Sequence, residues 1–235
     1  MPPRTERASR PQVEQWSGLA FIPVLATTVC YTLPSGLQKY AAVQFLPQLL
    51  GYLALALWAS KHDVISFRLG LNSSQLPQGL QWGLPVGVSL GAVNTIVILW
   101  IAPWLGADIE FLRETPHARA PALVMLPWAI LCIAIGVELN FRGFLLGRLL
   151  AFSHHTPLSE YPPLASATAI VGSALVFSFD PFMVATFKHL HWIAVWDGLV
   201  WGMMWVRLRN LYATITAHAI EVIVMYSVLK MVFRT

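Results

Sequence analysis

Charged side chains are scarce in this sequence: Asp, Glu, Lys and Arg make up 11% of its 235 residues, against about 25% in an ordinary soluble domain. Cysteine is rarer still, with only Cys30 and Cys132. Both lie in apolar stretches, and neither has a metal-ligand spacing such as C-x-x-C. This argues against redox chemistry and a structural zinc site and favours two buried small hydrophobic residues.

Apolar residues fill most of the chain instead, at 57% of the sequence, with ten Trp and twelve Phe. A membrane helix needs roughly 20 mainly apolar residues, and several such stretches occur. The sequence predicts an all-α polytopic membrane helical bundle of about seven transmembrane helices, with six to eight as the range. The expected spans are 17–33, 41–59, 80–104, 121–150, 163–183, 190–208 and 211–233. Residues 180–195 are either a broken helix or a loop that dips into the bilayer.

The distribution of basic residues indicates the orientation. With a cytoplasmic N-terminus, nine of the fifteen Lys and Arg residues fall on the cytoplasmic side and six on the other, a modest excess in the expected direction. We therefore expect an integral membrane protein of a bacterial inner (plasma) membrane, surrounded by the lipid bilayer, with its N-terminus cytoplasmic. The basic residues are scattered rather than clustered on one face, so the net charge of +4 does not indicate nucleic-acid binding.

Glycine recurs with a helical spacing in the third expected span. Gly79, Gly83, Gly87 and Gly91 are each four residues apart and share one helix face. Small residues spaced in this way let two helix backbones approach closely in lipid. We expect this face to pack against another helix of the same chain.

Several polar residues interrupt the apolar stretches, where a charge at the centre of a membrane helix costs about 2.5 to 3.5 kcal/mol and often marks a site. Glu138 and Arg142 are four residues apart and are placed to pair on one helix face. His218 and Glu221 are three apart and share a face of the last span. The Glu138–Arg142 pair is either part of a functional site or a clasp between helices.

The residues around this pair resemble a known family. Glu138, Phe141, Arg142 and Gly143 match the motif E-E-x-x-x-R, followed by Gly, of the CPBP intramembrane proteases (CAAX protease and bacteriocin-processing, also called Abi). Val137 stands where the family has its first Glu, the residue taken to activate the attacking water.

Two further motifs extend the resemblance over residues 120–225. The family motif F-x-x-x-H is matched around Phe177, but Pro181 stands where the histidine belongs, and a literal F-x-x-x-H occurs instead at 187–191. The stretch that runs through the turn at 207–212 to His218 resembles the penultimate helix and the final H-A-x-x-N helix, with Val222 in place of Asn. The resemblance divides the chain into a cytoplasmic tail (1–16), N-terminal transmembrane helices (17–119) and a CPBP/Abi-like core (120–235).

The resemblance implies an intramembrane endopeptidase of the glutamic type, with no cofactor and no metal, acting on a peptide or membrane-protein substrate. Glu138, or Glu221 as a substitute acid, would be the base on a water, and a histidine would polarise the scissile carbonyl. The expected catalytic residues are Glu138, Arg142, His218 and His191, and the expected substrate-binding residues are Asn140, Asp180 and Glu221.

Two other functions remain open because three family motif positions differ. The chain is alternatively a catalytically degenerate CPBP-fold scaffold or peptide-binding partner, which would associate with another membrane protein or with itself. A proton-coupled carrier with Asp180, Asp197 and Glu221 as a relay has less support, since no inverted repeat or pair of broken helices is evident.

Overall fold

The computed structural model describes residues 14–233, and within this range the chain forms helices joined by turns, without a strand. The α-helices are α1 (Phe21–Thr32), α2 (Ser35–Gln38), α3 (Ala41–Ala59), α4 (Ile65–Leu69), α5 (Leu76–Ile96), α6 (Ala102–Trp104), α7 (Pro116–Arg119), α8 (Ala122–Val124), α9 (Ile130–Glu138), α10 (Gly147–Ser153), α11 (Pro162–Ser178), α12 (Pro181–Phe187), α13 (Ile193–Leu208) and α14 (Leu211–Phe233). The 3₁₀ segments are η1 (Ser17–Ala20), η2 (Ser73–Gln75), η4 (Glu110–Glu114), η7 (Pro157–Glu160) and η8 (Lys188–Leu190), and the π-helical segments are η3 (Val97–Ile101), η5 (Met125–Ala129) and η6 (Leu139–Leu146). The all-α prediction is confirmed.

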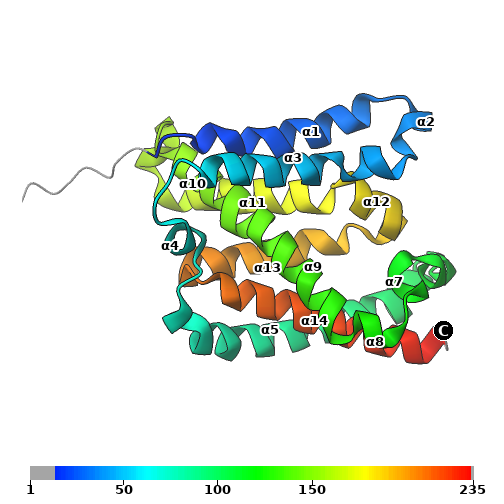
Figure 1. Ribbon diagram of the computed structural model, residues 1–235. Coiled ribbons are helices and arrows are strands. Elements are labelled where there is room, and N and C mark those ends of the chain that lie inside the picture. The colour runs from blue at the N-terminus through cyan, green and yellow to red at the C-terminus, as the bar shows by residue number, and fades with distance from the viewer. Residues whose placement is uncertain (1–13, 234–235) are drawn as a thin grey trace, which may run out of the picture.

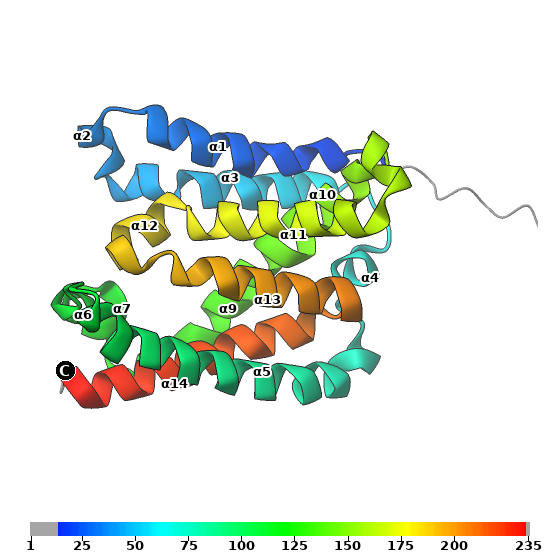
Figure 2. The ribbon, with the colours of Figure 1, turned by 180° about the vertical axis from the view of Figure 1, so that it is seen from behind.

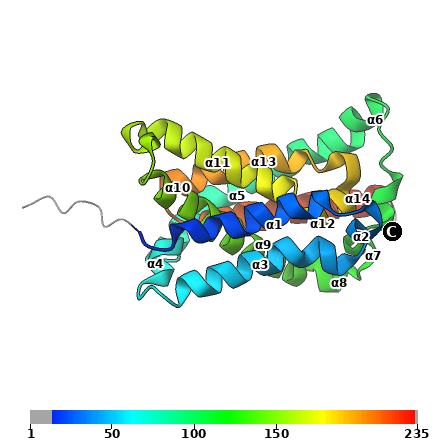
Figure 3. The same cartoon turned by 90° about the horizontal axis from the view of Figure 1, so that it is seen from above.

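The long helices lie side by side in one bundle (Figure 1). Helices α1 and α3 lie on one side, α5 and α14 on the opposite side, and α11 and α13 between them, which the view from behind also shows (Figure 2). From above, α1 lies between α3 and α11 (Figure 3). Helix α9 crosses the bundle obliquely (Figure 1). Helices α4 and α10 lie at one end of the bundle, and α7, α12 and the C-terminal part of α14 lie at the other.

Four helical segments are long and apolar enough to cross a membrane: 41–59, 65–104, 122–153 and 211–233. Helices α11 and α12 form a fifth only if counted as one span, because the chain bends by 55° between them. The apolar segment Ser17–Thr32 is shorter, and α13 has 16 residues. The helix positions agree with the expected spans except at 163–183, where α11 ends at Ser178 and the chain bends before α12. The number of seven crossings stays a prediction.

The glycine face of α5 packs against α14, which confirms the expected contact within the chain. Gly79, Gly83, Gly87 and Gly91 are all buried. A Cβ added at Gly83 would lie 2.5 Å from the Cβ of Thr216. The two backbones therefore approach so closely that only glycine fits along this face.

The cysteine prediction holds for one residue of the two. Cys30 is buried as expected, but Cys132 is exposed. The prediction of two buried thiols is therefore wrong at Cys132. This side chain lies on the wall of a cavity and not between packed helices.

Candidate functional site

The polar centre of the bundle lies where α9 passes into the π-helical segment η6. Glu138 ends α9, and its carboxyl group has no exposed surface. Its Oε1 atom lies 3.3 Å from an Nη of Arg142 and 3.0 Å from Nδ1 of His218 on α14. One carboxylate oxygen therefore joins the expected ion pair to a histidine from the last helix.

Arg142 lies in an aromatic environment. Its guanidinium carbon is 4.6 Å from the ring centre of Phe177 and 4.8 Å from that of Trp201, within the range of cation–π attraction. Among the described residues its Nε and both Nη atoms have no hydrogen-bond acceptor. The charge of Glu138 and the two ring faces thus stabilise this buried cation.

The imidazole of His218 is held on two sides. Trp201 stacks on it with ring centroids 4.4 Å apart and planes at 18°, and Glu138 binds its Nδ1. Because a carboxylate oxygen only accepts hydrogen bonds, Nδ1 carries the proton in this contact and Nε2 is the unprotonated nitrogen of the neutral ring. This arrangement fixes both the orientation and the tautomer of the ring.

A cavity of about 490 Å³ lies against this centre. Its wall includes His218 and Glu221 but not Glu138, which contacts His218. The other polar or ionisable side chains on the wall are Gln48, Tyr52, Asn94, Thr115, His117, Cys132, Asp180, His191, Asp197, Tyr226 and Lys230. Val137 and Val222, two of the positions that differ from the family motifs, also face this cavity.

Two acidic residues, Asp197 and Glu221, lie together on the wall of the same cavity. The Nδ2 atom of Asn94 donates to Glu221 at 2.7 Å and to both carboxyl oxygens of Asp197 at 3.1 Å. The indole of Trp196 donates to the amide oxygen of Asn94 at 2.9 Å. Helices α5 and α14 thus each contribute one side chain to this network, and α13 contributes two. Asn94 was not among the predicted site residues; its only sequence signal is its position three residues after Gly91.

Three other predicted site residues lie apart from this centre. Asp180 caps the N-terminus of α12 and accepts from Gln48 at 2.9 Å. His191 also faces the cavity, but its Nδ1 bonds the carbonyl oxygen of Lys188 at 2.6 Å. Asn140 is buried against Gly51 of α3 and is not part of the cavity wall.

Among residues 14–233, no group of three or more His, Cys, Asp or Glu side chains is arranged to hold a metal ion. The polar centre consists of two clusters beside one cavity. One joins Glu138, Arg142 and His218, and the other joins Asn94, Asp197 and Glu221.

The helical bundle and its buried centre define a polytopic membrane protein with ionisable groups around a cavity. Residues 119–224 match the family model of type II CAAX prenyl endopeptidase Rce1-like proteins. The match confirms the predicted resemblance and includes Glu138, Arg142 and His218, and at the family level it supports an intramembrane endopeptidase. No curated protein and no solved structure matches the chain.

Proposed function

We propose that this chain is an intramembrane endopeptidase in which His218, oriented by Glu138, activates a water molecule in the cavity. The observation that carries the proposal is the 3.0 Å contact between Glu138 and an imidazole on the cavity wall. Arg142 in turn holds the carboxylate at 3.3 Å. The family match over the same residues supports this class of reaction.

The positions of the protons on the His218 ring suit a general base. Its Nδ1–H is committed to Glu138, so Nε2 is free to accept a proton from water. A buried carboxylate that holds a histidine in one tautomer and stabilises the imidazolium recurs in unrelated hydrolases. This assigns Glu138 a positioning role, in contrast to the base expected from the sequence.

Hydrolysis then proceeds in balanced steps. Nε2 of His218 takes a proton from water while the water oxygen bonds to the carbonyl carbon of the peptide. The imidazolium returns that proton to the peptide nitrogen as the C–N bond breaks. The products are a carboxylic acid and an amine, and the imidazole is neutral again.

Glu221 and Asp197 supply a second acidic group for this reaction. Both side chains accept from the same Nδ2 atom of Asn94, so the two carboxyl groups lie close together, and two acids sharing one buried site favour a proton on one of them. A protonated carboxyl group beside the cavity can donate a hydrogen bond to the scissile carbonyl oxygen as negative charge develops there. Asn94 keeps the two groups together through its three hydrogen bonds.

The departures from the family motifs support this assignment. Val137 and Val222 place apolar groups on the cavity wall where the family has Glu and Asn, so neither position can hold a water. On α14, Glu221 is the one carboxylic acid, and it lies on the cavity wall three residues after His218. We assign the missing acidic function to Glu221 for this reason.

The cavity supports a peptide with apolar side chains as the substrate. Its volume of about 490 Å³ lies in the range of about 300 to 1,000 Å³ that is typical of ligand pockets. Apolar wall residues come from several helices and include Ile98, Met125, Ile133, Leu229 and Phe233. We propose a peptide or the end of a membrane protein as the substrate class, and a bacterial inner membrane with a cytoplasmic N-terminus as the location.

A second candidate function is that of a peptide-binding scaffold without turnover. It is favoured by the complete burial of Glu138 and Arg142, which is the geometry of a clasp between helices, and by the apolar residues at the family's motif positions. In this case the cavity binds a peptide, and the polar groups serve packing alone.

The two functions are distinguished by cleavage assays in lipid nanodiscs with a set of fluorogenic apolar peptides, one of which carries a prenylated C-terminal cysteine. We expect His218→Gln and Glu221→Gln each to lower cleavage at least about 100-fold, the range expected for loss of a general acid or base. The exposed His155 provides a matched control as His155→Gln. Melting temperatures recorded in parallel separate lost chemistry from lost folding.

Undiminished cleavage in His218→Gln would refute the role of that residue. Binding of the peptides without cleavage by the parent protein would favour the scaffold.

A further inference from the structure

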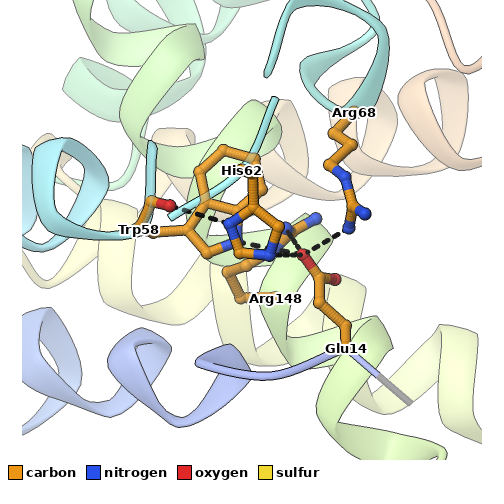
Figure 4. Close-up of polar contacts among 5 residues, drawn as sticks. All are labelled: Glu14, Trp58, His62, Arg68 and Arg148. Atoms are coloured by element: carbon orange, nitrogen blue, oxygen red, sulfur yellow. Dashed lines mark hydrogen bonds and ion pairs between the residues drawn. The ribbon is translucent and has the colours of Figure 1, made fainter. Parts of the chain in front are cut away.

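A second cluster of charges lies at the end of the bundle that carries α4 and α10, away from the cavity. Trp58, His62, Arg68 and Arg148 converge there on the carboxylate of Glu14 (Figure 4). We call these four residues the cationic cradle. None of them belongs to the cavity wall.

All contacts to the cradle use one oxygen of Glu14. The Oε1 atom accepts from the Trp58 indole at 2.9 Å and from an Nη of Arg68 at 3.0 Å, and it also bonds an Nη of Arg148. Nε2 of His62 lies 3.6 Å from the same atom. The Nδ1 atom of His62 bonds the Trp58 carbonyl oxygen at 2.8 Å, which fixes the ring so that Nε2 faces the anion.

The cradle holds more positive charge than Glu14 neutralises. Arg68 and Arg148 carry two charges against the one carboxylate of Glu14. Arg148 is only 4% exposed, stacks on Trp58 at 4.1 Å, and its buried Nε has no acceptor within residues 14–233. A buried guanidinium donor without an acceptor is costly, so this site is suited to an anion that presents oxygens in several directions, whereas Glu14 contacts the cradle through one oxygen.

The cradle lies at the ends of apolar helices. Trp58 is in the last turn of α3, and Arg148 lies in α10, near the end of the segment 122–153. The excess of Lys and Arg that sets the expected orientation places this end at the cytoplasmic leaflet, where anionic phospholipids attract basic residues. Head-group phosphates lie where the apolar part of a membrane-spanning helix ends.

We propose that the cationic cradle is a phosphate-binding site that takes the head group of an anionic phospholipid, and that the Glu14 carboxylate occupies it otherwise. A phosphate group has several acceptor oxygens, so it can satisfy the two guanidinium groups and the indole N–H together, and Arg is the side chain that best matches this geometry. Binding displaces the Glu14 side chain from the cradle. The proposal does not depend on proteolysis.

Binding is measured on the full chain in a zwitterionic detergent, by titration with dioctanoyl phosphatidylglycerol, dioctanoyl phosphatidylcholine or inorganic phosphate. We expect Glu14→Gln to bind phosphatidylglycerol at least tenfold more tightly than the parent, because the competing carboxylate is gone. Glu160→Gln removes an exposed carboxylate and controls for the change in net charge. Neither variant alters the cavity.

A second pair of variants tests the cradle directly. Arg68 is 41% exposed at its side chain, so Arg68→Gln is expected to fold and to weaken phosphatidylglycerol binding at least tenfold. Arg207→Gln removes an exposed charge outside the cradle and is expected to leave binding unchanged. Melting curves of both variants verify that they are folded.

The three ligands identify the source of the phosphate. Binding of phosphatidylglycerol but not phosphatidylcholine or inorganic phosphate supports a lipid site. Equal binding of inorganic phosphate supports the cradle as a phosphate site but assigns it to a free anion instead of a lipid. The proposal is overturned if Glu14→Gln binds no more tightly than Glu160→Gln, or if Arg68→Gln and Arg207→Gln weaken binding equally.

Discussion

A single methyl group added at Gly87 tests the helix packing that supports the site. A Cβ there would lie 2.5 Å from the carbonyl oxygen of Ala217 and 2.8 Å from the Cβ of Ile220. The first of these atoms belongs to the backbone, so no side-chain rotation relieves the clash and α5 must move away from α14. Overpacking costs about 1 to 3 kcal/mol, and the better helix propensity of Ala returns about 1 kcal/mol. The net loss lies between about 0 and 2 kcal/mol. Because the clash is with the backbone, we expect the upper end for Gly87→Ala, a free energy of unfolding lowered by about 2 kcal/mol.

The matched control is Gly172→Ala in α11, where the added Cβ would lie 3.6 Å from a methyl group of Leu149, an ordinary contact. This variant is expected to be as stable as the parent or more stable by up to about 1 kcal/mol. Both are measured by unfolding in a mild detergent with increasing SDS, followed by circular dichroism. The reasoning about this helix face is refuted if the two variants unfold at the same SDS fraction.

Two further predictions concern charges. Glu138→Gln and Arg142→Met, each alone, leave a buried charge without its partner and are expected to cost about 3 to 5 kcal/mol, whereas the double variant costs less than their sum; additive losses in SDS unfolding would show that the pair is not coupled. Burial lowers the pKa of His117, in the loop helix α7, below its ordinary value of 6.5. The unfolded chain therefore binds a proton first, so stability is full above pH 6.5 and falls as the pH drops toward the folded pKa. Melting curves at several pH values should show this slope reduced in His117→Phe, and an unchanged slope would contradict the assignment.

The sequence predicted those features that depend on local spacing. The apolar stretches located the helices because a membrane-spanning backbone must satisfy its hydrogen bonds within each helix. The four-residue spacing predicted both the glycine face of α5 and the contact between Glu138 and Arg142. The motif comparison placed His218 in the same site.

The sequence did not show which side chains face the cavity. Glu138 is not part of the cavity wall, whereas His218, which it contacts, is, and the role of Glu138 as the base on a water stays a prediction. Asn140, expected to bind substrate, lies against Gly51 of α3. Which side of the helix after Glu138 meets the cavity depends on how α3 and α14 pack around it, and the spacing of residues within one helix does not show this.

The glycine face of α5 and the acidic network of the cavity are parts of one arrangement. A Cβ at Gly91 would lie 2.9 Å from the carbonyl oxygen of Glu221, so the close approach of the backbones at Gly91 brings α5 directly beside that residue. Asn94 is three residues further along the same side of α5, and only at this separation does its short amide reach Glu221 at 2.7 Å. A larger residue at Gly91 should therefore separate Asn94 from Glu221 and leave the two acids without their shared donor, which links the packing of the bundle to the chemistry of its cavity.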